Sequence, residues 1–224
     1  MTAEGLPPTI AIDGPSASGK GTVAQRVALQ LGFHYLDSGA LYRLVALAAI
    51  DAGVALDDEA GLGRTAATLE ASFSGVDITL NHKLVTDAIR TEAVSAAASR
   101  IAALAPVRSA LLARQRAFRQ MPGLVADGRD MGTVVFPDAV LKIYLTADAE
   151  TRALRRYKQL IGKGMNANMA TLLQDIRSRD ERDRGRSVAP LQKSDESIPL
   201  DTTQLDIDAA VEQVLMHYFA ATKA

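Results

Sequence analysis

The stretch Ile10-Ala-Ile-Asp-Gly14-Pro-Ser-Ala-Ser-Gly19-Lys20-Gly21-Thr22 decides the fold of this chain of 224 residues. Gly14, Gly19 and Lys20 fit the phosphate-loop pattern G-x-x-x-x-G-K, in which backbone N–H groups surround phosphates and the lysine reaches their outer oxygens. The flanks supply the context that this pattern requires, because Thr9–Ile12 resembles a strand and Lys20–Leu31 carries apolar residues at helical spacing. The stretch therefore predicts a site for a nucleoside triphosphate.

The end of this loop indicates which class of nucleotide-binding protein is expected. The position after Lys20 is usually serine or threonine, but here it is Gly21, and the hydroxyl arrives one residue later at Thr22. A G-K-G-T ending is typical of kinases that phosphorylate nucleoside monophosphates. In phosphoryl transfer, Lys20 would supply positive charge and Thr22 a ligand for a magnesium ion. A simple turn between strand and helix would leave the lysine inside the loop unexplained.

The composition of the chain excludes several classes of protein. Hydrophobic residues make up 48% of the chain, which is enough for a sizeable core in one domain with insertions. The net charge of −1 does not favour a nucleic-acid or membrane partner. Cysteine is absent, and the three histidines lack ligand spacing, so we expect neither disulfides nor a zinc site. With no signal peptide evident, and Leu41–Ile50 too short for a membrane span, we expect a soluble cytoplasmic protein.

Buried strands and helices alternate along the chain. The expected strands are short apolar runs at Thr9–Ile12, Phe33–Leu36, Leu124–Ala126, Ala139–Leu145 and Ile198–Leu200. The expected helices lie at Lys20–Leu31, Ser38–Ala52 (with Ser38 as N-cap), Thr91–Leu104, Pro106–Gln120, Ala149–Leu160 and Met169–Arg184, and from Ile207 onward. This order predicts an α/β fold of the P-loop NTPase type, with a parallel sheet flanked by helices.

The region from about residue 61 to residue 90 has a different character. Apolar residues alternate there with polar ones on both sides of Asn81-His82-Lys83, at Val76, Ile78, Leu80 and Leu84. Alternation on both sides of a short polar turn predicts a β-hairpin.

Polar residues follow the predicted strands at the points where these strands end. Asp37-Ser38 follows the second strand, and Asp127-Gly128-Arg129-Asp130 follows the run Leu124–Ala126. Ligands of parallel α/β sheets gather at the carboxyl ends of the strands, so these clusters and the phosphate loop are expected to share a site. Asp127 is placed as a carboxylate that holds a magnesium-bound water; the alternative is a turn aspartate before Gly128.

An arginine-dense segment follows near residue 180. Arg179, Arg182, Asp183 and Arg186 lie at i, i+3, i+4 and i+7, which is one face if the helix continues past Gly185. Three guanidinium groups and one carboxylate suit the phosphate and ribose of a nucleotide. The segment could instead be a solvated helix end. The interleaved acidic residues argue against a nucleic-acid surface.

Taken together, these segments closely resemble the bacterial cytidylate kinases. The resemblance is carried in chain order by residues 12–22, 36–43, 114–118, 126–138 and 182–191. The run D-G-R-D-M-G-T-V-V-F-P-D at 127–138 and the run R-D-R-G-R-S-V-A-P-L at 182–191 are far more specific than the phosphate loop. The resemblance implies a single kinase domain over 1–224, with a CMP-binding insertion at about 61–104 and a short lid at about 157–170. It also implies the transfer of a phosphoryl group from ATP to CMP or dCMP.

Site residues follow from the resemblance by position. ATP would be held by Gly14, Pro15, Ser16, Ala17, Ser18, Gly19, Lys20, Gly21 and Thr22. CMP would be contacted by Ser38, Arg43, Ser99, Arg108, Arg129, Asp130, Arg179, Asp183 and Arg186. Catalytic roles would belong to Lys20, Arg43, Arg129 and Arg182. The cofactor would be Mg2+, bound through Thr22 and, by way of a water molecule, Asp127.

Three other functions compete with this interpretation. A P-loop kinase for another small acceptor, such as shikimate, would lack the run at 127–138. A nucleotide-switched GTPase would carry an Asn-Lys-x-Asp motif, which this sequence lacks. An RNA-binding protein would use the arginine segment without the interleaved acids. We therefore expect ATP and CMP or dCMP as partners of a monomer, with no nucleic acid and no membrane.

Overall fold

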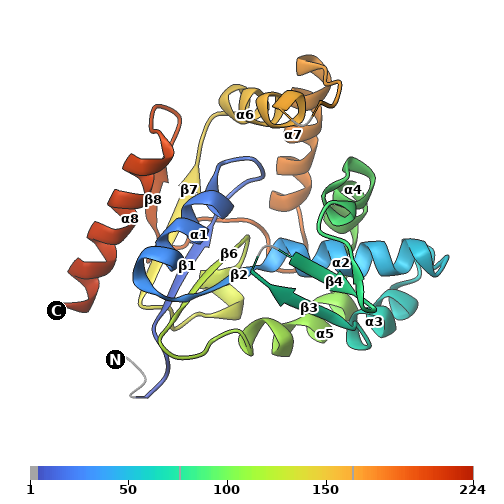
Figure 1. The fold of residues 1–224 in the computed structure, drawn as a ribbon, viewed down its shortest axis with the longest axis horizontal. Coiled ribbons are helices and arrows are strands. Elements are labelled where there is room, and N and C mark those ends of the chain that lie inside the picture. Colours follow the sequence, from blue (N-terminus) through green and yellow to red (C-terminus); the bar gives the residue numbers. More distant parts are fainter. Residues whose placement is uncertain (1–4, 76, 163, 224) are drawn as a thin grey trace. The chain divides into compact units, whose positions relative to one another are not determined.

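The computed structural model describes residues 5–75, 77–162 and 164–223. These residues form two compact units (Figure 1). The first unit contains the residues up to Leu36 together with those from Phe118 onward, and the second unit is Asp37–Ala117.

The first unit is built on a five-stranded sheet. Its strands lie in the order β2-β6-β1-β7-β8, namely His34–Asp37, Leu124–Gly128, Thr9–Asp13, Leu141–Thr146 and Ile198–Asp201. Strand β1 pairs in parallel with both β6 and β7, so that Ile10 lies beside Val125 on one side and Leu141 on the other. The central strand β1 and its neighbour β6 are buried along their whole length, as expected from their near-continuous apolar sequence. The predicted parallel sheet flanked by helices is confirmed.

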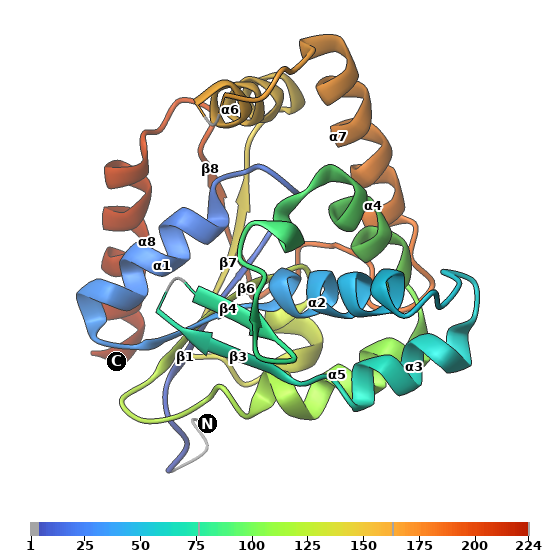
Figure 2. The same ribbon diagram turned by 45° about the vertical axis from the view of Figure 1, so that its right-hand side comes forward.

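Helices and one irregular turn complete this unit. They are α1 (Lys20–Leu31), the π-helical turn η2 (Met131–Val135), α6 (Ala149–Gly162), α7 (Met169–Arg184) and α8 (Ile207–Thr222). Helices α1 and α8 pack together against the sheet, and their buried side chains form a core with those of β1, β6 and β7. Helix α6 packs on α7, as both ribbon views show (Figures 1 and 2).

The second unit combines helices with a small antiparallel sheet. Its elements are α2 (Ser38–Asp51), α3 (Glu59–Ala67), β3 (Ala71–Ser74), β4 (Asp77–Leu80), β5 (Lys83–Leu84), the 3-10 turn η1 (Ala88–Arg90), α4 (Glu92–Ile101) and α5 (Ala105–Arg116). Helix α2 packs on α4, and α3 packs on α5. A Cβ atom at Gly63 would lie 2.8 Å from the Pro106 side chain, so glycine permits this close helix contact.

Most of the predicted elements are present within a few residues of their predicted bounds. The turn of the predicted hairpin lies at Asn81 and His82, whose φ angles are 48° and 64°. Strands β4 and β5 flank this turn and pair in antiparallel. The third strand β3 extends this hairpin, and Val76 lies outside the described residues. Helix α3 and the turn η2 were not predicted.

Two predicted helix ends need correction. The N-cap of α2 is Asp37 rather than Ser38, because the Asp37 side chain accepts a hydrogen bond from the Ala40 N–H at 2.9 Å. The helix predicted over Thr91–Leu104 is shorter, since Thr91 is its N-cap and it ends at Ile101. In both cases a side-chain oxygen bonds to a free N–H of the first turn and so determines where the helix begins.

Candidate active site

The phosphate loop leaves β1 and leads directly into α1. A Cβ atom at Gly14 would lie 1.9 Å from the Leu145 carbonyl oxygen, so only glycine fits where the loop passes β7. Ala17 and Gly19 adopt left-handed backbone conformations, with φ of 58° and 94°. Gly19 is the N-cap of α1 and forms no side-chain cap hydrogen bond. The first turn of α1 therefore keeps N–H groups that can bind an anion.

Lys20 and Ser18 point back into this loop. The Lys20 ammonium group donates to the Pro15 carbonyl at 3.2 Å, and the Ser18 hydroxyl donates to the same oxygen at 3.0 Å. The Ser16 hydroxyl is buried and has no hydrogen-bond partner among the described residues. A buried polar oxygen without a partner is uncommon, and here it lies in a loop whose sequence predicts a phosphate ligand.

Two arginines of α6 hold the outer side of the loop. Arg152 donates to the Ser16 carbonyl at 3.2 Å, and Arg155 donates to the Ser18 carbonyl at 3.0 Å. Arg155 also donates to the carbonyl of Thr202, which follows β8, at 2.6 Å. Neither arginine was predicted from the sequence. Their position offered a signal, because α6 begins just beyond the carboxyl end of β7, at the edge of the sheet where a ligand was expected.

Asp127 lies beside the start of α1, where a metal ligand was predicted. Its side chain is buried and accepts a hydrogen bond from the Tyr35 hydroxyl at 2.6 Å. A Cβ atom at Gly21 would lie 3.3 Å from the Asp127 Oδ2 atom, so the carboxylate is next to the backbone that precedes Thr22. The Thr22 side chain is exposed. Carboxylate and hydroxyl oxygens are the donors that Mg2+ accepts, and Mg2+ usually keeps waters between itself and the protein. The residues present therefore fit this ion.

Asp13 joins the phosphate loop to the segment that carries Arg129. Its two carboxylate oxygens accept hydrogen bonds from the N–H groups of Met131 and Gly132, both at 2.8 Å. Burial raises the pKa of Asp13 to about 7, although the two N–H groups oppose this shift. The carboxylate thus holds the start of η2 against the end of β1.

Arg129, which is partly buried, forms an ion pair with the fully buried Asp183. The Arg129 Nε atom donates to Asp183 Oδ2 at 2.7 Å, and Arg186 donates to Asp183 Oδ1. Burial alone would raise the pKa of Asp183, but the guanidinium groups of Arg129, Arg186 and Arg179 outweigh it and hold that pKa below its ordinary value. Burial by itself would lower the pKa of Arg129, and the Asp183 carboxylate instead raises it. Both groups are therefore charged at neutral pH.

The buried face of helix α7 contains only part of the predicted charged face. Its buried residues are Leu172, Ile176, Asp180 and Asp183, whereas Arg182 is exposed. The helix ends at Arg184, and Arg186 lies beyond the Gly185 cap. Arg186 nevertheless reaches Asp183, because the chain turns at Gly185. Arg179, Asp183 and Arg186 thus belong to one charged cluster, as the pKa of Asp183 indicates. The condition for a single helical face with all four residues, a helix that continues past Gly185, is not met.

In the second unit, Ser38 and Arg43 lie in the first turns of α2. Ser38 is buried. Arg43 donates to the Asp37 carboxylate at 2.7 Å, and its Nε atom is buried without a hydrogen-bond partner among the described residues. A Cβ atom at Gly39 would lie 3.1 Å from a guanidinium nitrogen of Arg43, so glycine leaves room for this side chain to fold back.

Ser99 and Arg108 lie on consecutive helices of the same unit. Ser99 belongs to α4 and is 4% exposed, and its hydroxyl has no hydrogen-bond partner in the described part of the chain. Arg108 belongs to α5, is buried, and donates to the Ala102 carbonyl at 3.2 Å in the turn between the two helices. Both side chains are therefore inside the unit, and neither is the solvent-facing residue of an ordinary amphipathic helix.

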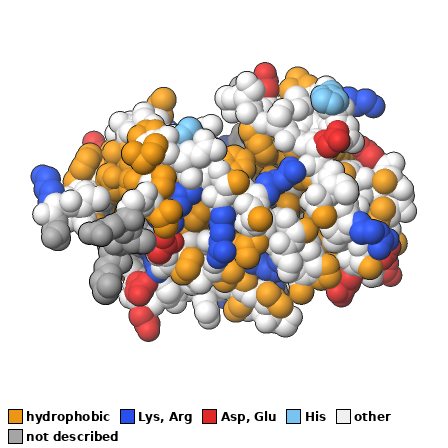
Figure 3. Space-filling view, turned by 90° about the horizontal axis from the view of Figure 1, so that it is seen from below, with side chains coloured by type: hydrophobic (Ala, Val, Ile, Leu, Met, Phe, Trp, Pro, Cys, Tyr) orange, Lys and Arg blue, Asp and Glu red, His pale blue; other side chains and the backbone are white. Residues whose placement is uncertain are grey.

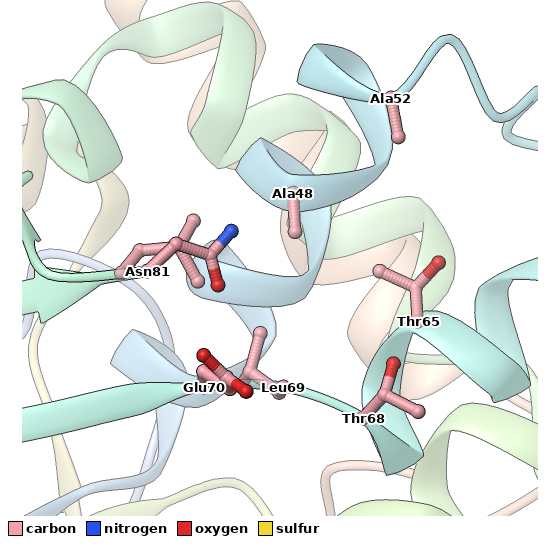
Figure 4. A pocket seen from close by; sticks show the side chains of 8 residues that line it. Ala48, Ala52, Thr65, Thr68, Leu69, Glu70 and Asn81 are labelled. Carbon is pink, nitrogen blue, oxygen red and sulfur yellow. The ribbon is translucent and has the colours of Figure 1, made fainter.

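A separate cavity of about 410 Å³ lies in the second unit (Figure 4). Its lining, as far as the structure describes it, contains the carboxylate of Glu70 and no lysine or arginine; the lining residues are Ala48, Ala52, Thr65, Thr68, Leu69, Glu70, Leu80 and Asn81. Because a phosphate requires positive charge, this cavity is unsuited to a nucleotide phosphate.

Basic side chains are scattered over the face drawn in Figure 3. The described lysine and arginine side chains of this face are separated by hydrophobic and uncharged groups, and they form no continuous basic stripe. No single described helix is both long and apolar enough to cross a membrane. Helices α4 and α5 satisfy that criterion only when joined, and the chain bends by 101° between them.

Comparisons with known proteins agree with this geometry. Residues 10–220 match the family model described as cytidylate kinase. A cytidylate kinase of Chromobacterium violaceum is 59% identical over 208 residues, covering 93% of this chain and 94% of that protein. A cytidylate kinase of Pseudomonas aeruginosa is 57% identical over 219 residues, covering 95% of this chain and 96% of that protein. Among solved structures, an uncharacterized protein from Eubacterium ventriosum has a TM-score of 0.50 at 14% identity, covering 94% of this chain and 98% of that one. This last likeness concerns the fold alone.

Proposed function

The chain belongs to the cytidylate kinase family, and from this premise we propose how it transfers a phosphoryl group from ATP to CMP or dCMP. One observation carries the proposal for this chain. In the first unit, a phosphate loop with an uncapped helix N-terminus is tied through Asp13 to the segment that holds the Arg129–Asp183 ion pair. A donor site and part of an acceptor site are thereby held by one rigid sheet.

The phosphate loop, Gly14 to Thr22, binds the phosphates of ATP. This proposal is supported by the open first turn of α1 and by the Lys20 ammonium group, which donates to a carbonyl of its own loop at 3.2 Å. A phosphate oxygen is a stronger acceptor for this ammonium group than a neutral carbonyl, because the bond is charge-assisted at both ends. Lys20 then stabilises the negative charge that develops as the phosphoryl group is transferred.

Mg2+ is the cofactor of this proposal. Thr22 would hold it directly and Asp127 through a water molecule, with Tyr35 orienting the Asp127 carboxylate. When bound, the ion neutralises charge on the phosphates of ATP.

The acceptor nucleotide is bound by charged and polar side chains. In the first unit, Arg129 carries a partly buried and permanently charged guanidinium group suited to the CMP phosphate, and Asp183 offers a carboxylate to the ribose hydroxyls. Asp130, Arg179 and Arg186 belong to the same proposal. In the second unit, the Arg43 Nε atom and the Ser99 hydroxyl are both buried, and neither has a hydrogen-bond partner among the described residues. Ser38 and Arg108 are proposed contacts of CMP there. A catalytic role for Arg182 stays a prediction, and its side chain is exposed.

An acceptor panel tests this function. ADP release from ATP is measured with CMP, dCMP, UMP and AMP as acceptors, in the presence of Mg2+ and after its removal by a chelator. We expect CMP and dCMP to have the highest kcat/KM and the chelator to abolish turnover. AMP or UMP as the best acceptor would refute the proposed substrate, and full turnover without a divalent ion would refute the cofactor.

The proposal includes a monomeric enzyme that acts in the cytoplasm and has no nucleic-acid or membrane partner. The acidic residues among the arginines of α7 support the absence of a nucleic-acid surface. Sedimentation of the purified chain at several concentrations checks its monomeric state.

A further inference from the structure

A buried ion pair connects α6 to α7. Arg152 of α6 is 4% exposed and Asp180 of α7 is 8% exposed. The two terminal guanidinium nitrogens of Arg152 donate to the two carboxylate oxygens of Asp180, at 3.0 Å and 2.6 Å. This forked geometry fixes the orientation of both side chains, which a single contact does not.

The same guanidinium group also reaches the phosphate loop. One terminal nitrogen of Arg152 donates to the Ser16 carbonyl at 3.2 Å, and its Nε atom donates to the Ala147 carbonyl at 2.9 Å. Every nitrogen of Arg152 is therefore bonded, and the side chain touches the loop, the segment after β7, and α7. A displacement of the Ser16 carbonyl changes the geometry of the whole fork.

Asp180 lies three residues before Asp183 on the buried face of α7. Asp183 is bonded to Arg129, the proposed phosphate ligand of the acceptor. Helix α7 is thus held at two adjacent points, by the donor loop through Asp180 and by the acceptor arginine through Asp183. Because a helix transmits displacement along its axis with little deformation, a shift at one point moves the other.

We propose that Arg152 and Asp180 are positioning residues that couple the phosphate loop to Asp183, so that a nucleoside triphosphate and its acceptor strengthen each other's binding. The inference rests on the proposed function, because it takes Gly14–Thr22 as the donor site and Arg129 with Asp183 as acceptor contacts. Such coupling is reciprocal, and typical values are about fivefold or more in affinity.

A second ion pair between the same helices provides a matched control. Arg177 of α7 donates to Glu150 of α6 at 2.7 Å, and the two side chains are 59% and 63% exposed. This pair touches no loop of the site in the described structure. Glu150→Gln therefore removes a link between α6 and α7 without changing the phosphate loop.

The experiment measures CMP affinity by calorimetry, with and without a saturating non-hydrolysable ATP analogue and Mg2+. In the unmodified protein we expect the analogue to lower the Kd of CMP about fivefold or more. Asp180→Asn should bring that ratio close to one, and Glu150→Gln should leave it unchanged. The reverse measurement, analogue affinity with and without CMP, should give the same ratio for each protein.

Folding is checked by circular dichroism, and Arg152→Lys serves as a second variant. Lysine keeps the positive charge next to Asp180. Its single ammonium group cannot replace the forked hydrogen bonds to both Asp180 oxygens together with those to the Ser16 and Ala147 carbonyls. In Arg152→Lys, the ratio of the CMP Kd values without and with the ATP analogue should therefore also fall close to one. This variant tests the inference even if Asp180→Asn fails to fold.

The outcomes separate this inference from the proposed function. Binding of neither nucleotide to the unmodified protein would refute the proposed function. Binding of both with a ratio of one would overturn the inference alone. A ratio retained by the folded Asp180 and Arg152 variants, or lost equally in Glu150→Gln, would overturn it as well.

Discussion

Lys20 is the residue on which the donor chemistry depends most directly. The residue is 8% exposed and its ammonium group donates at 3.2 Å to a carbonyl of its own loop, so it is already positioned when the nucleotide arrives. Lys20→Ala should lower kcat by about a hundredfold or more, because one preorganised charge next to the transferred group is lost. Steady-state kinetics check this, with the exposed Lys83→Ala as control. Turnover close to the unmodified value in folded Lys20→Ala would contradict the assignment of the loop.

Ser99 separates a binding role from a structural one. Its hydroxyl is buried without a hydrogen-bond partner in the described structure, so Ser99→Ala should change the free energy of unfolding by less than about 0.5 kcal/mol. If the hydroxyl bonds to CMP, the same variant should raise the KM for CMP about threefold to tenfold, with the KM for ATP unchanged. Urea unfolding and kinetics are measured together. A large loss of stability with an unchanged KM would assign Ser99 to the core.

Asp13 makes stability depend on pH. Its pKa of about 7 in the folded protein exceeds the ordinary value of 3.8, so between these values the folded chain binds a proton that the unfolded chain has released. Its contribution to stability is therefore fully present below about pH 4 and is lost as the pH rises through about 7.

Asp13→Asn should remove this dependence. The free energy of unfolding of the unmodified protein, relative to that of the variant, should fall as the pH rises from about 5 to about 8, by at most about 1.4 kcal/mol per pH unit. Urea unfolding of both proteins at several pH values tests this. If the free energies of unfolding of the two proteins changed with pH in parallel, the titrating group would be one other than Asp13.

At the scale of elements, the junction between β1 and the phosphate loop allows almost no variation. Gly14 faces the Leu145 backbone, where a Cβ atom would lie 1.9 Å from the carbonyl oxygen. Gly32, the cap that ends α1, has φ of 67°, but a Cβ atom there would have open space around it. The requirement for glycine at position 32 is therefore purely conformational, whereas at position 14 it is also steric.

These two glycines give a graded prediction. Gly32→Ala should cost about 1–2 kcal/mol of the free energy of unfolding, which is the penalty of a left-handed residue. Gly14→Ala should cost on the order of 3 kcal/mol or more, because β7 and the loop must separate. Urea unfolding of the two variants compares the costs. Equal costs would mean that the loop can shift freely at Gly14.

The first unit as a whole should respond to its ligand. A nucleoside triphosphate that binds only the folded chain stabilises it by about 2.7 kcal/mol at a concentration of a hundred times its Kd. For a chain of this length, such a gain raises the midpoint of thermal unfolding by roughly 5–10 °C. We expect that shift with an ATP analogue and Mg2+, and its loss in Lys20→Ala at the same concentration. Thermal unfolding followed by circular dichroism measures it, and an unshifted midpoint for the unmodified protein would argue against nucleotide binding.

The local parts of this molecule were predictable from the sequence. The phosphate loop, the buried strands beside it and the helix Met169–Arg184 follow from patterns of a few adjacent residues, such as glycine spacing, continuous apolar runs and 3.6-residue periodicity. Asp127 and Arg129 were placed at the expected ligand edge of the sheet because polar residues at the ends of parallel strands share one edge. In each case the physical cause lies within one element and its ends.

The partners of the charged residues were decided only by the tertiary structure. Asp13 bonds to N–H groups 118 and 119 positions away, Arg129 to a carboxylate 54 positions away and Arg152 to one 28 positions away. Periodicity indicates which side of a helix is buried, but it carries no information about which side chain faces it. It therefore placed Arg182 on one face with Asp183, whereas the packed helix buries Asp183 together with Asp180 and leaves Arg182 exposed. Those pairings follow from the strand order β6-β1-β7, which brings the loops after three distant strands to one edge of the sheet.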